Sequence, residues 1–309
     1  MRRRSLMRLG GILLLSGGLL ACGERRAEVD PTPQYSRHGK VDTPVYVLAI
    51  HPLHNPARLF EVYGPLVDHL NRQIPAVTFA LEASRNYEEF ERKLFLRQVA
   101  FALPNPYQTL RAQRHGYHVI AKMGDDAQFR GVILVRRDAG ITEVSDLRGR
   151  KVAYPAATAL AATMLPQAFL HSQGLDVNRD IENIYVGSQE SSIMNVYLGR
   201  VAAAATWTQP WQAFQKTHPT QASELVVQWE TQSLINNSVV ARDDIPPGTV
   251  KRVAEELASL HTTASGRTLL AAMELTRFEL ADDARYTVVR DFLDRFSRTV
   301  RPLPPEAAP

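Results

Sequence analysis

The 309-residue sequence contains one cysteine, Cys22. A lone cysteine leaves three uses open: lipid attachment, a free thiol or an intermolecular disulfide. The patterns G-x-S-x-G, H-E-x-x-H, G-x-G-x-x-G and the P-loop are all missing, and the nine histidines lie without a motif partner. Each of those patterns carries a specific reaction or cofactor. Their absence argues against an enzyme and predicts no cofactor.

Metal-binding residues are scarce too. His51 and His54 form an H-x-x-H pair, but no cysteine or nearby acid completes a set of ligands. Because zinc sites draw three or four ligands from the protein, no metal site is predicted.

The excess of basic over acidic residues comes entirely from the N-terminus. The formal net charge is +4, and four of the 36 Lys and Arg residues fall in the first eight positions, which hold no acid. The rest of the chain therefore balances its 32 acidic residues. Binding to nucleic acid would need a clustered basic face, so no nucleic-acid partner is predicted.

The N-terminus has the pattern of an export signal. Residues 1–21 combine the arginines with the apolar run LGGILLLSGGLL, which is too short to span a bilayer as a mature helix. The run ends in LLAC, which resembles the bacterial lipobox, so we expect a lipoprotein signal peptide over residues 1–21 and a membrane anchor on Cys22. Gly23 is not an aspartate, so we expect the periplasmic side of the envelope, at the outer membrane if the cell has one. The general and twin-arginine export routes both stay open.

A polar stretch separates this signal from the folded part. Residues 22–43 are rich in polar side chains, contain prolines and lack periodicity, which predicts a tether. From Pro44 onward, apolar runs of strand length such as VYVLAI and VAFALP alternate with amphipathic helical patterns. This alternation predicts an α/β fold in which each lobe has a mainly parallel sheet flanked by helices. Two such units and a helical tail predict two lobes with a cleft between them.

Four segments resemble the periplasmic phosphonate-, phosphite- and phosphate-binding proteins of ABC importers, which have the two-lobed type II periplasmic binding protein fold. The segments are AIHPLHNPARLFEVYGPLVDHL, VAFALPNPY, FRGVILVRRDAGITEVSDLRGRKVAY and VGSQESSIMNVYLGRVAAAAT. The sequence also departs from the family. The usual Ser-Thr-Ser-Gly turn is YPAATALAAT here, the usual histidine is Gln189, and a usual aspartate is Ala202.

The resemblance implies an organisation in lobes. Residues 44–136 would begin lobe 1, residues 137–231 would form lobe 2, and residues 232–309 would return to lobe 1 and add C-terminal helices. Two hinge crossings are expected, near Arg137 and Gln232.

The resemblance also implies a function. We expect a monomeric solute-binding lipoprotein that captures a small polar solute, in particular a phosphonate, phosphite or phosphate oxyanion, for an ABC permease. One alternative is a periplasmic partner of a membrane sensor kinase. Another is a binder of an amine or aromatic solute through an aromatic cage, with the residues Tyr185, Trp207, Trp211 and Trp229.

The polar start of one predicted helix, GSQESS, is the first candidate for the binding site. Helix N-termini at the carboxyl ends of strands present unpaired N–H groups to a ligand. Gln189 and Ser191 are therefore candidate ligand residues, whereas Ser188 is read as the helix cap. Glu190 would repel an oxyanion and should point away or meet a donor. Thr158 in PAATA is a further candidate, with capping as the alternative.

The remaining candidates come from the first lobe and the crossing. His54 follows the first strand, and Asn105 and Tyr107 follow the third, so all three are expected at carboxyl ends of strands. The alternative for each of these three residues is that its side chain only holds its own loop in place. Arg130 is a candidate because an arginine at a cleft binds oxyanions strongly, although a surface position is equally open.

Overall fold

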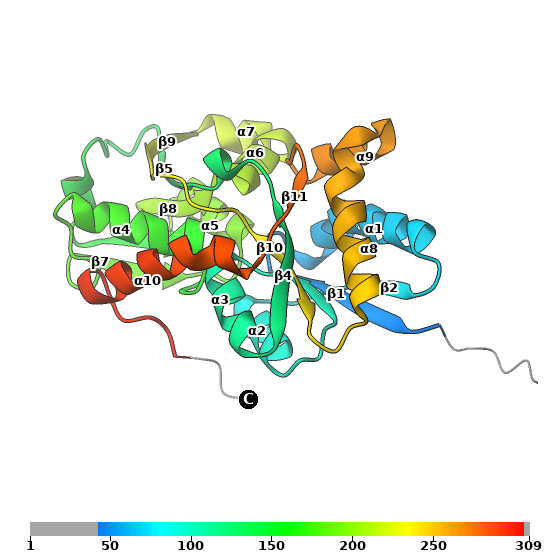
Figure 1. Cartoon of the computed structure of the whole chain (residues 1–309). Helices are drawn as coiled ribbons and strands as arrows, with labels where there is room; N and C mark the ends of the chain where they lie inside the picture. Colours follow the sequence, from blue (N-terminus) through cyan, green and yellow to red (C-terminus); the bar gives the residue numbers. More distant parts are fainter. Residues whose placement is uncertain (1–42, 306–309) are drawn as a thin grey trace, which may run out of the picture. The chain divides into compact units, whose positions relative to one another are not determined.

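The computed structural model describes residues 43–305 and contains two sheets, each with helices on both faces (Figure 1). The first sheet has the strand order β11-β4-β10-β3-β1-β2, and the second has the order β7-β6-β8-β5-β9. In Figure 1 the second sheet and helices α4 to α7 lie in the left half, and helices α1, α8 and α9 lie to the right. The fold is therefore two-lobed and α/β, as the sequence predicted.

Lobe 1 is built on the first sheet. Its strands are β1 (Val45–Ile50), β2 (Thr78–Ala83), β3 (Phe101–Leu103), β4 (Tyr117–Met123), β10 (Ser238–Arg242) and β11 (Phe278–Leu280). Its helices are α1 (Pro56–Gln73), α2 (Tyr87–Phe95), α3 (Pro106–Arg114), α8 (Pro247–Ser259), α9 (Ala264–Ala272) and α10 (Thr287–Thr299). Short 3-10 turns are η4 (Leu260–Thr262) and η5 (Asp283–Tyr286).

Lobe 2 is built on the second sheet. Its strands are β5 (Gly131–Arg136), β6 (Arg150–Tyr154), β7 (Ile181–Tyr185), β8 (Ala203–Trp207) and β9 (Leu225–Glu230). Its helices are α4 (Leu165–Ser172), α5 (Gln189–Tyr197), α6 (Thr208–Thr217) and α7 (Pro219–Ser223). A π-helical turn, η3 (Leu160–Met164), leads directly into α4, and η2 (Val144–Leu147) precedes β6.

Strand directions follow from the path of the chain between the lobes. Strands β1 to β4 point the same way, and so do β6 to β9. The first strand after each crossing, β5 or β10, runs in the opposite direction, as does β11. The sheets are therefore mixed, because each crossing inserts a reversed strand.

The crossings occupy residues 124–130, which include η1 (Asp126–Gln128), and residues 231–237. The second crossing contains Gln232. The first lies ahead of Arg137, because the apolar run that reads as the end of lobe 1 pairs with β8 and β9 in the second sheet.

Strand β5 shows why both faces of a sheet are covered. Ile133 and Val135 lie in one apolar cluster, and Val132 and Leu134 lie in another. Alternate side chains of a strand point to opposite faces, so this run of apolar residues needs helices on both sides.

Helix starts after the strands are fixed by side-chain caps. Asn55, Asn86 and Asn105 cap α1, α2 and α3, and Ser188 caps α5. In each case the side-chain oxygen accepts a backbone N–H three residues on, which satisfies a donor that the helix leaves unpaired. These caps hold the helix starts at the carboxyl ends of the strands.

Within residues 43–305, no helix combines the length and the apolar character that crossing a bilayer requires. The predicted signal peptide, Cys22 and all of the tether except Thr43 lie outside the described residues.

Candidate functional site

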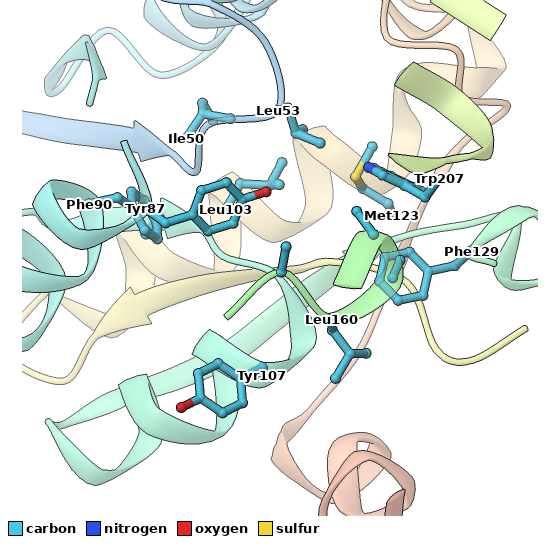
Figure 2. Packing of buried hydrophobic residues seen from close by; sticks show 14 of the residues in the cluster. Ile50, Leu53, Tyr87, Phe90, Leu103, Tyr107, Met123, Phe129, Leu160 and Trp207 are labelled. Atoms are coloured by element: carbon cyan, nitrogen blue, oxygen red, sulfur yellow. The ribbon is translucent and has the colours of Figure 1, made fainter. Parts of the chain in front are cut away.

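A small cavity lies where the lobes meet. Its volume is about 10 Å³, which is close to the space that a single water molecule needs. Figure 2 shows Tyr87 on one side of this region and Phe129 and Trp207 on the other. The cavity is lined by His51, Tyr87, Asn105 and Asn237 of lobe 1, by Phe129 of the crossing, and by residues 159–162, Gln189 and Trp207 of lobe 2.

The backbone of residues 159–162 offers donors to this cavity. The first backbone N–H groups bonded into the turn are those of Thr163 and Met164, and both reach Ala159 O. The N–H groups of residues 160–162 therefore precede the hydrogen-bonded ladder of a continuous helical segment, η3 and α4. Alanine side chains here leave the backbone accessible, and a π turn often occurs at functional sites.

Gln189 connects the two lobes across the cavity. Its Nε2 lies 3.1 Å from the Tyr87 hydroxyl, and its Oε1 accepts from Thr206 at 2.9 Å. The Gln189 side chain is 2% exposed. Its amide is thus held between α2 of one lobe and β8 of the other.

Asn105 makes a second link between the lobes. Its Oδ1 caps α3, and its Nδ2 donates to Thr158 O at 3.0 Å. The Thr158 hydroxyl donates to Glu91, which also accepts from Gln108 Nε2. Burial raises the pKa of Glu91. Thr158 is therefore used between the lobes, and its side chain does not line the cavity.

A wider groove, of about 340 Å³, lies between α1 and helices α5 and α6. Its polar side chains include those of His54, Arg58, Glu61, Glu190 and His218. Burial and the nearby Arg58 lower the pKa of His54 to about 4. Asn55 Nδ2 donates to Glu190 Oε2 at 2.7 Å, so Glu190 meets a donor, as the sequence reasoning expected.

The candidate residues are divided between several places. Asn105 and Gln189 line the cavity, and His54 and Gln189 line the groove. Ser191 lies beside the α5 cap, where its hydroxyl accepts from Ser188 Oγ at 2.9 Å. Ser188 is the cap, as predicted.

Two candidates lie away from the cavity. Arg130 donates to Ala127 O and, at 3.1 Å, to Glu230 Oε2, so its guanidinium stays at the crossing. Tyr107 is set apart in Figure 2, and its hydroxyl donates to Pro304 O.

The aromatic residues of the predicted cage do not converge on one cavity. Trp207 lines the cavity and meets Phe129 edge to face, at 5.1 Å between ring centroids. Trp211 packs on Phe214 in a separate apolar cluster, and Tyr185 is 44% exposed.

Three polar side chains of the cavity were not among the candidates: His51, Tyr87 and Asn237. His51 was considered only as half of a metal pair. Its Nδ1 lies 2.8 Å from Leu103 O, and among the described residues no group of three or more His, Cys, Asp or Glu is arranged to hold a metal. Asn237 is the last residue of the second crossing, directly before β10. That position is a signal that could have identified it.

No charged side chain lines the cavity. Its donors are backbone N–H groups, a phenol and side-chain amides. Such a site can hold a small polar or anionic group by hydrogen bonds and the positive end of a helix dipole.

Comparison with known proteins gives a family match over most of the chain. The model of the family described as "ABC transporter, phosphonate, periplasmic substrate-binding protein" matches residues 48–286. A probable ABC transporter phosphite binding protein, PhnD1 of Prochlorococcus marinus, is 22% identical over 194 residues, 59% of this chain and 65% of that protein. The tetrathionate sensor histidine kinase TtrS of Salmonella typhimurium is 27% identical over 157 residues, 46% of this chain and 25% of that protein. The chain thus spans less than two thirds of these relatives.

Solved structures share the fold. A binding protein component of an ABC phosphonate transporter from Pseudomonas aeruginosa gives a TM-score of 0.77 at 15% identity, covering 84% of this chain and 88% of that one. PhnD1 in complex with methylphosphonate gives 0.75 at 18% identity, covering 83% of this chain and 100% of that one.

Proposed function

The chain belongs to the family of phosphonate periplasmic substrate-binding proteins of ABC transporters, and on that premise we propose that it captures a small tetrahedral oxyanion between its lobes for an ABC permease. Phosphonate, phosphite and phosphate form the expected class. Its role is binding and delivery without catalysis, and it acts as a monomer.

The small cavity between the lobes supports this proposal most directly. Residues 159–162 line it from lobe 2, and Gln189 and Tyr87 bond to each other across it. Groups from both lobes meet there. The space now holds about one water molecule, so an oxyanion would enter with the lobes further apart, and its contacts with both lobes would favour the arrangement closed around it. We propose Gln189, Asn105 and Tyr87 as ligand residues. Thr158 and Ser191 would support the two helix starts, and His54 would act at the groove.

Calorimetry of the purified protein with phosphite, methylphosphonate and phosphate tests this function. Gln189→Ala should weaken binding roughly three- to a hundred-fold, the range for one lost hydrogen bond to a neutral or charged partner. Gln228→Ala is the matched control, because Gln228 is a glutamine of the same lobe whose amide bonds Thr142 O at the surface. Equal affinities in the two variants would place the solute elsewhere, and no binding of any oxyanion would contradict the function.

Ligand sensing is the second candidate. The match to the sensor kinase TtrS supports it, since the same closed lobes could be presented to a membrane kinase instead of a permease. Co-purification with a permease after crosslinking in cells would favour transport, and recovery of a histidine kinase would favour sensing.

We propose that the protein is a lipoprotein, anchored at Cys22 on the periplasmic side of the envelope and at the outer membrane where one exists. Cys22 directly follows an apolar run, and it is the chain's single cysteine, so no other thiol can take the lipid. Cys22→Ser should leave an unprocessed precursor or a soluble protein. Recovery of a mature-sized Cys22→Ser protein in the membrane fraction would contradict the anchor.

A further inference from the structure

Resting on the proposed function, we propose that the cavity selects an oxyanion that still carries a proton. The favoured ligand is the singly charged hydrogen phosphonate or hydrogen phosphite. A fully deprotonated dianion and a sulfonate, which has no proton to donate, are disfavoured. The reason is that the cavity presents two buried acceptors as well as donors.

His51 supplies the first acceptor. A carbonyl oxygen can only accept, so the 2.8 Å contact between His51 Nδ1 and Leu103 O places the ring proton on Nδ1. In the neutral ring the other nitrogen, Nε2, is then an acceptor, on a residue that lines the cavity. His51 is 2% exposed, and burial lowers its pKa to about 4, which keeps the ring neutral at physiological pH.

Asn237 supplies the second acceptor. Its side chain is fully buried and lines the cavity, and its Oδ1 has no hydrogen-bond partner among residues 43–305. Its Nδ2 contacts Met123 Sδ at 3.5 Å. A thioether can accept but cannot donate, so the sulfur favours the amide nitrogen on its side and leaves the oxygen without a donor. A buried acceptor without a donor is destabilising, and a donor on the ligand would satisfy it.

The donors complete the pattern. The N–H groups of residues 160–162 precede the helical ladder, and the Tyr87 hydroxyl, which accepts from Gln189 Nε2, keeps its own proton to donate. A singly protonated oxyanion has acceptor oxygens for these groups and one O–H for an acceptor. A dianion would set negative oxygens against His51 and Asn237 with no proton between them.

Charge around the cavity points the same way. No cationic side chain lines it, so nothing there neutralises a second negative charge. Lys122, beside Met123, is paired with Asp126 and Glu279. Glu91 hydrogen-bonds to Thr158 and does not line the cavity.

Several protein groups face these acceptors and could add a pH dependence of their own. His54 lies on the same loop as His51, and Tyr87 packs edge to face on the His51 ring. The charged groups near these residues are Glu91, which bonds to Thr158, and Lys122, which bonds to Met123 O. The experiment must separate their titration from that of the ligand.

Methylphosphonate and methanesulfonate make the separation, because they are similar in shape and only the first can carry a proton. A phosphoryl group loses its second proton at a pH of about 6 in a phosphate ester, and phosphonates titrate in the same neutral region. We would measure both affinities by calorimetry from pH 6 to pH 9, in two buffers of different ionisation enthalpy, to count protons taken up.

Methylphosphonate affinity should fall about tenfold per pH unit once the free ligand is a dianion, since the competent form becomes a shrinking fraction. Proton uptake should approach one per ligand bound. Methanesulfonate should bind roughly ten- to a hundred-fold more weakly at pH 6, as expected for a hydrogen bond lost at a charged ligand, and its affinity should not change with pH.

Variants assign the effect to residues. Asn237→Leu removes one acceptor and should reduce the preference for methylphosphonate. Asn71→Leu removes an amide that bonds Phe79 on the far side of lobe 1 and should leave that preference unchanged. Glu91→Gln should keep the pH dependence of methylphosphonate, because the ligand and not Glu91 titrates.

The wild-type titration decides the inference even if a variant does not fold. Equal affinities for the two probes, or methylphosphonate binding at high pH without proton uptake, would overturn the selection of a protonated ligand and leave the proposed function intact. Binding of neither probe at any pH would contradict the proposed function itself.

Discussion

Asn55 should control closure of the lobes separately from the stability of its own helix. Its Oδ1 caps α1 by accepting from Arg58 N at 3.0 Å, and its Nδ2 donates to Glu190 Oε2 at 2.7 Å. Asn55→Asp keeps an oxygen for the cap, where aspartate and asparagine are about equally good. It removes the donor that reaches the other lobe.

The size of the effect follows from these two contacts. Asn55 is exposed, so the lost hydrogen bond counts for about 1 kcal/mol. Two carboxylates about 4 Å apart repel by about 1 kcal/mol in water. A total of about 1 to 2 kcal/mol should reduce the closed population, and with it the apparent affinity for methylphosphonate, roughly five- to thirty-fold.

Calorimetry and urea unfolding on the same variants test the prediction. Asn86→Asp is the control, because Asn86 caps α2 in the same way by accepting from Glu89 N at 2.9 Å. Adding Glu190→Gln to Asn55→Asp should restore affinity, since the bond can reform with the donor and acceptor exchanged. The reasoning fails if Asn55→Asp binds as tightly as wild type, or if Asn86→Asp weakens binding to the same extent.

Four further substitutions probe the packing around the site and elsewhere in the fold. Gly131→Ala should destabilise the protein by about 1 to 3 kcal/mol, because a Cβ would lie 2.5 Å from Ala161 O. Gly248→Ala meets nothing within 4 Å and should instead stabilise it by about 0.4 to 1 kcal/mol in urea unfolding. Burial holds the pKa of His51 at about 4 against 6.5, so the unfolded state takes up the proton first. The free energy of unfolding should therefore be highest above pH 6.5 and should fall by about 3 kcal/mol as the pH falls towards 4. His51→Phe should reduce this dependence of the unfolding free energy on pH, measured by urea unfolding. Arg301→Gln should lower methylphosphonate affinity in calorimetry, because the guanidinium donates to a carbonyl in the loop before residues 159–162; an unchanged affinity would show that the loop holds its shape alone.

The fold could be predicted from the sequence because its signals are local. Alternating apolar runs and helical patterns located the strands of both lobes. The first crossing was placed too late because β5 reads like any other apolar strand, and only its pairing with β8 and β9 assigns it to lobe 2.

The site was less predictable because its contacts join distant segments. Polar residues after strands were correctly located at helix starts, but their first role is capping, as Asn105 and Ser188 show. Tyr107 follows Asn105 by two residues, yet its hydroxyl meets Pro304, a contact that no local pattern encodes. Tyr87 begins a helix like many others, and only its bond to Gln189 of the other lobe marks it.

Asparagine caps explain how a turn made of alanines can still form a binding site. A capping asparagine uses its Oδ1 for the helix and keeps its Nδ2 for another partner. A serine has one hydroxyl oxygen and no second polar atom for this purpose. At Asn105 that nitrogen holds Thr158 O, two residues before the first of the backbone donors of residues 160–162. Closing the lobes therefore fixes the donors that would bind the solute. Since one bond serves both events, a substitution at Asn105 should change closure and affinity together, whereas a substitution at Asn55, outside the cavity, should change affinity through closure alone.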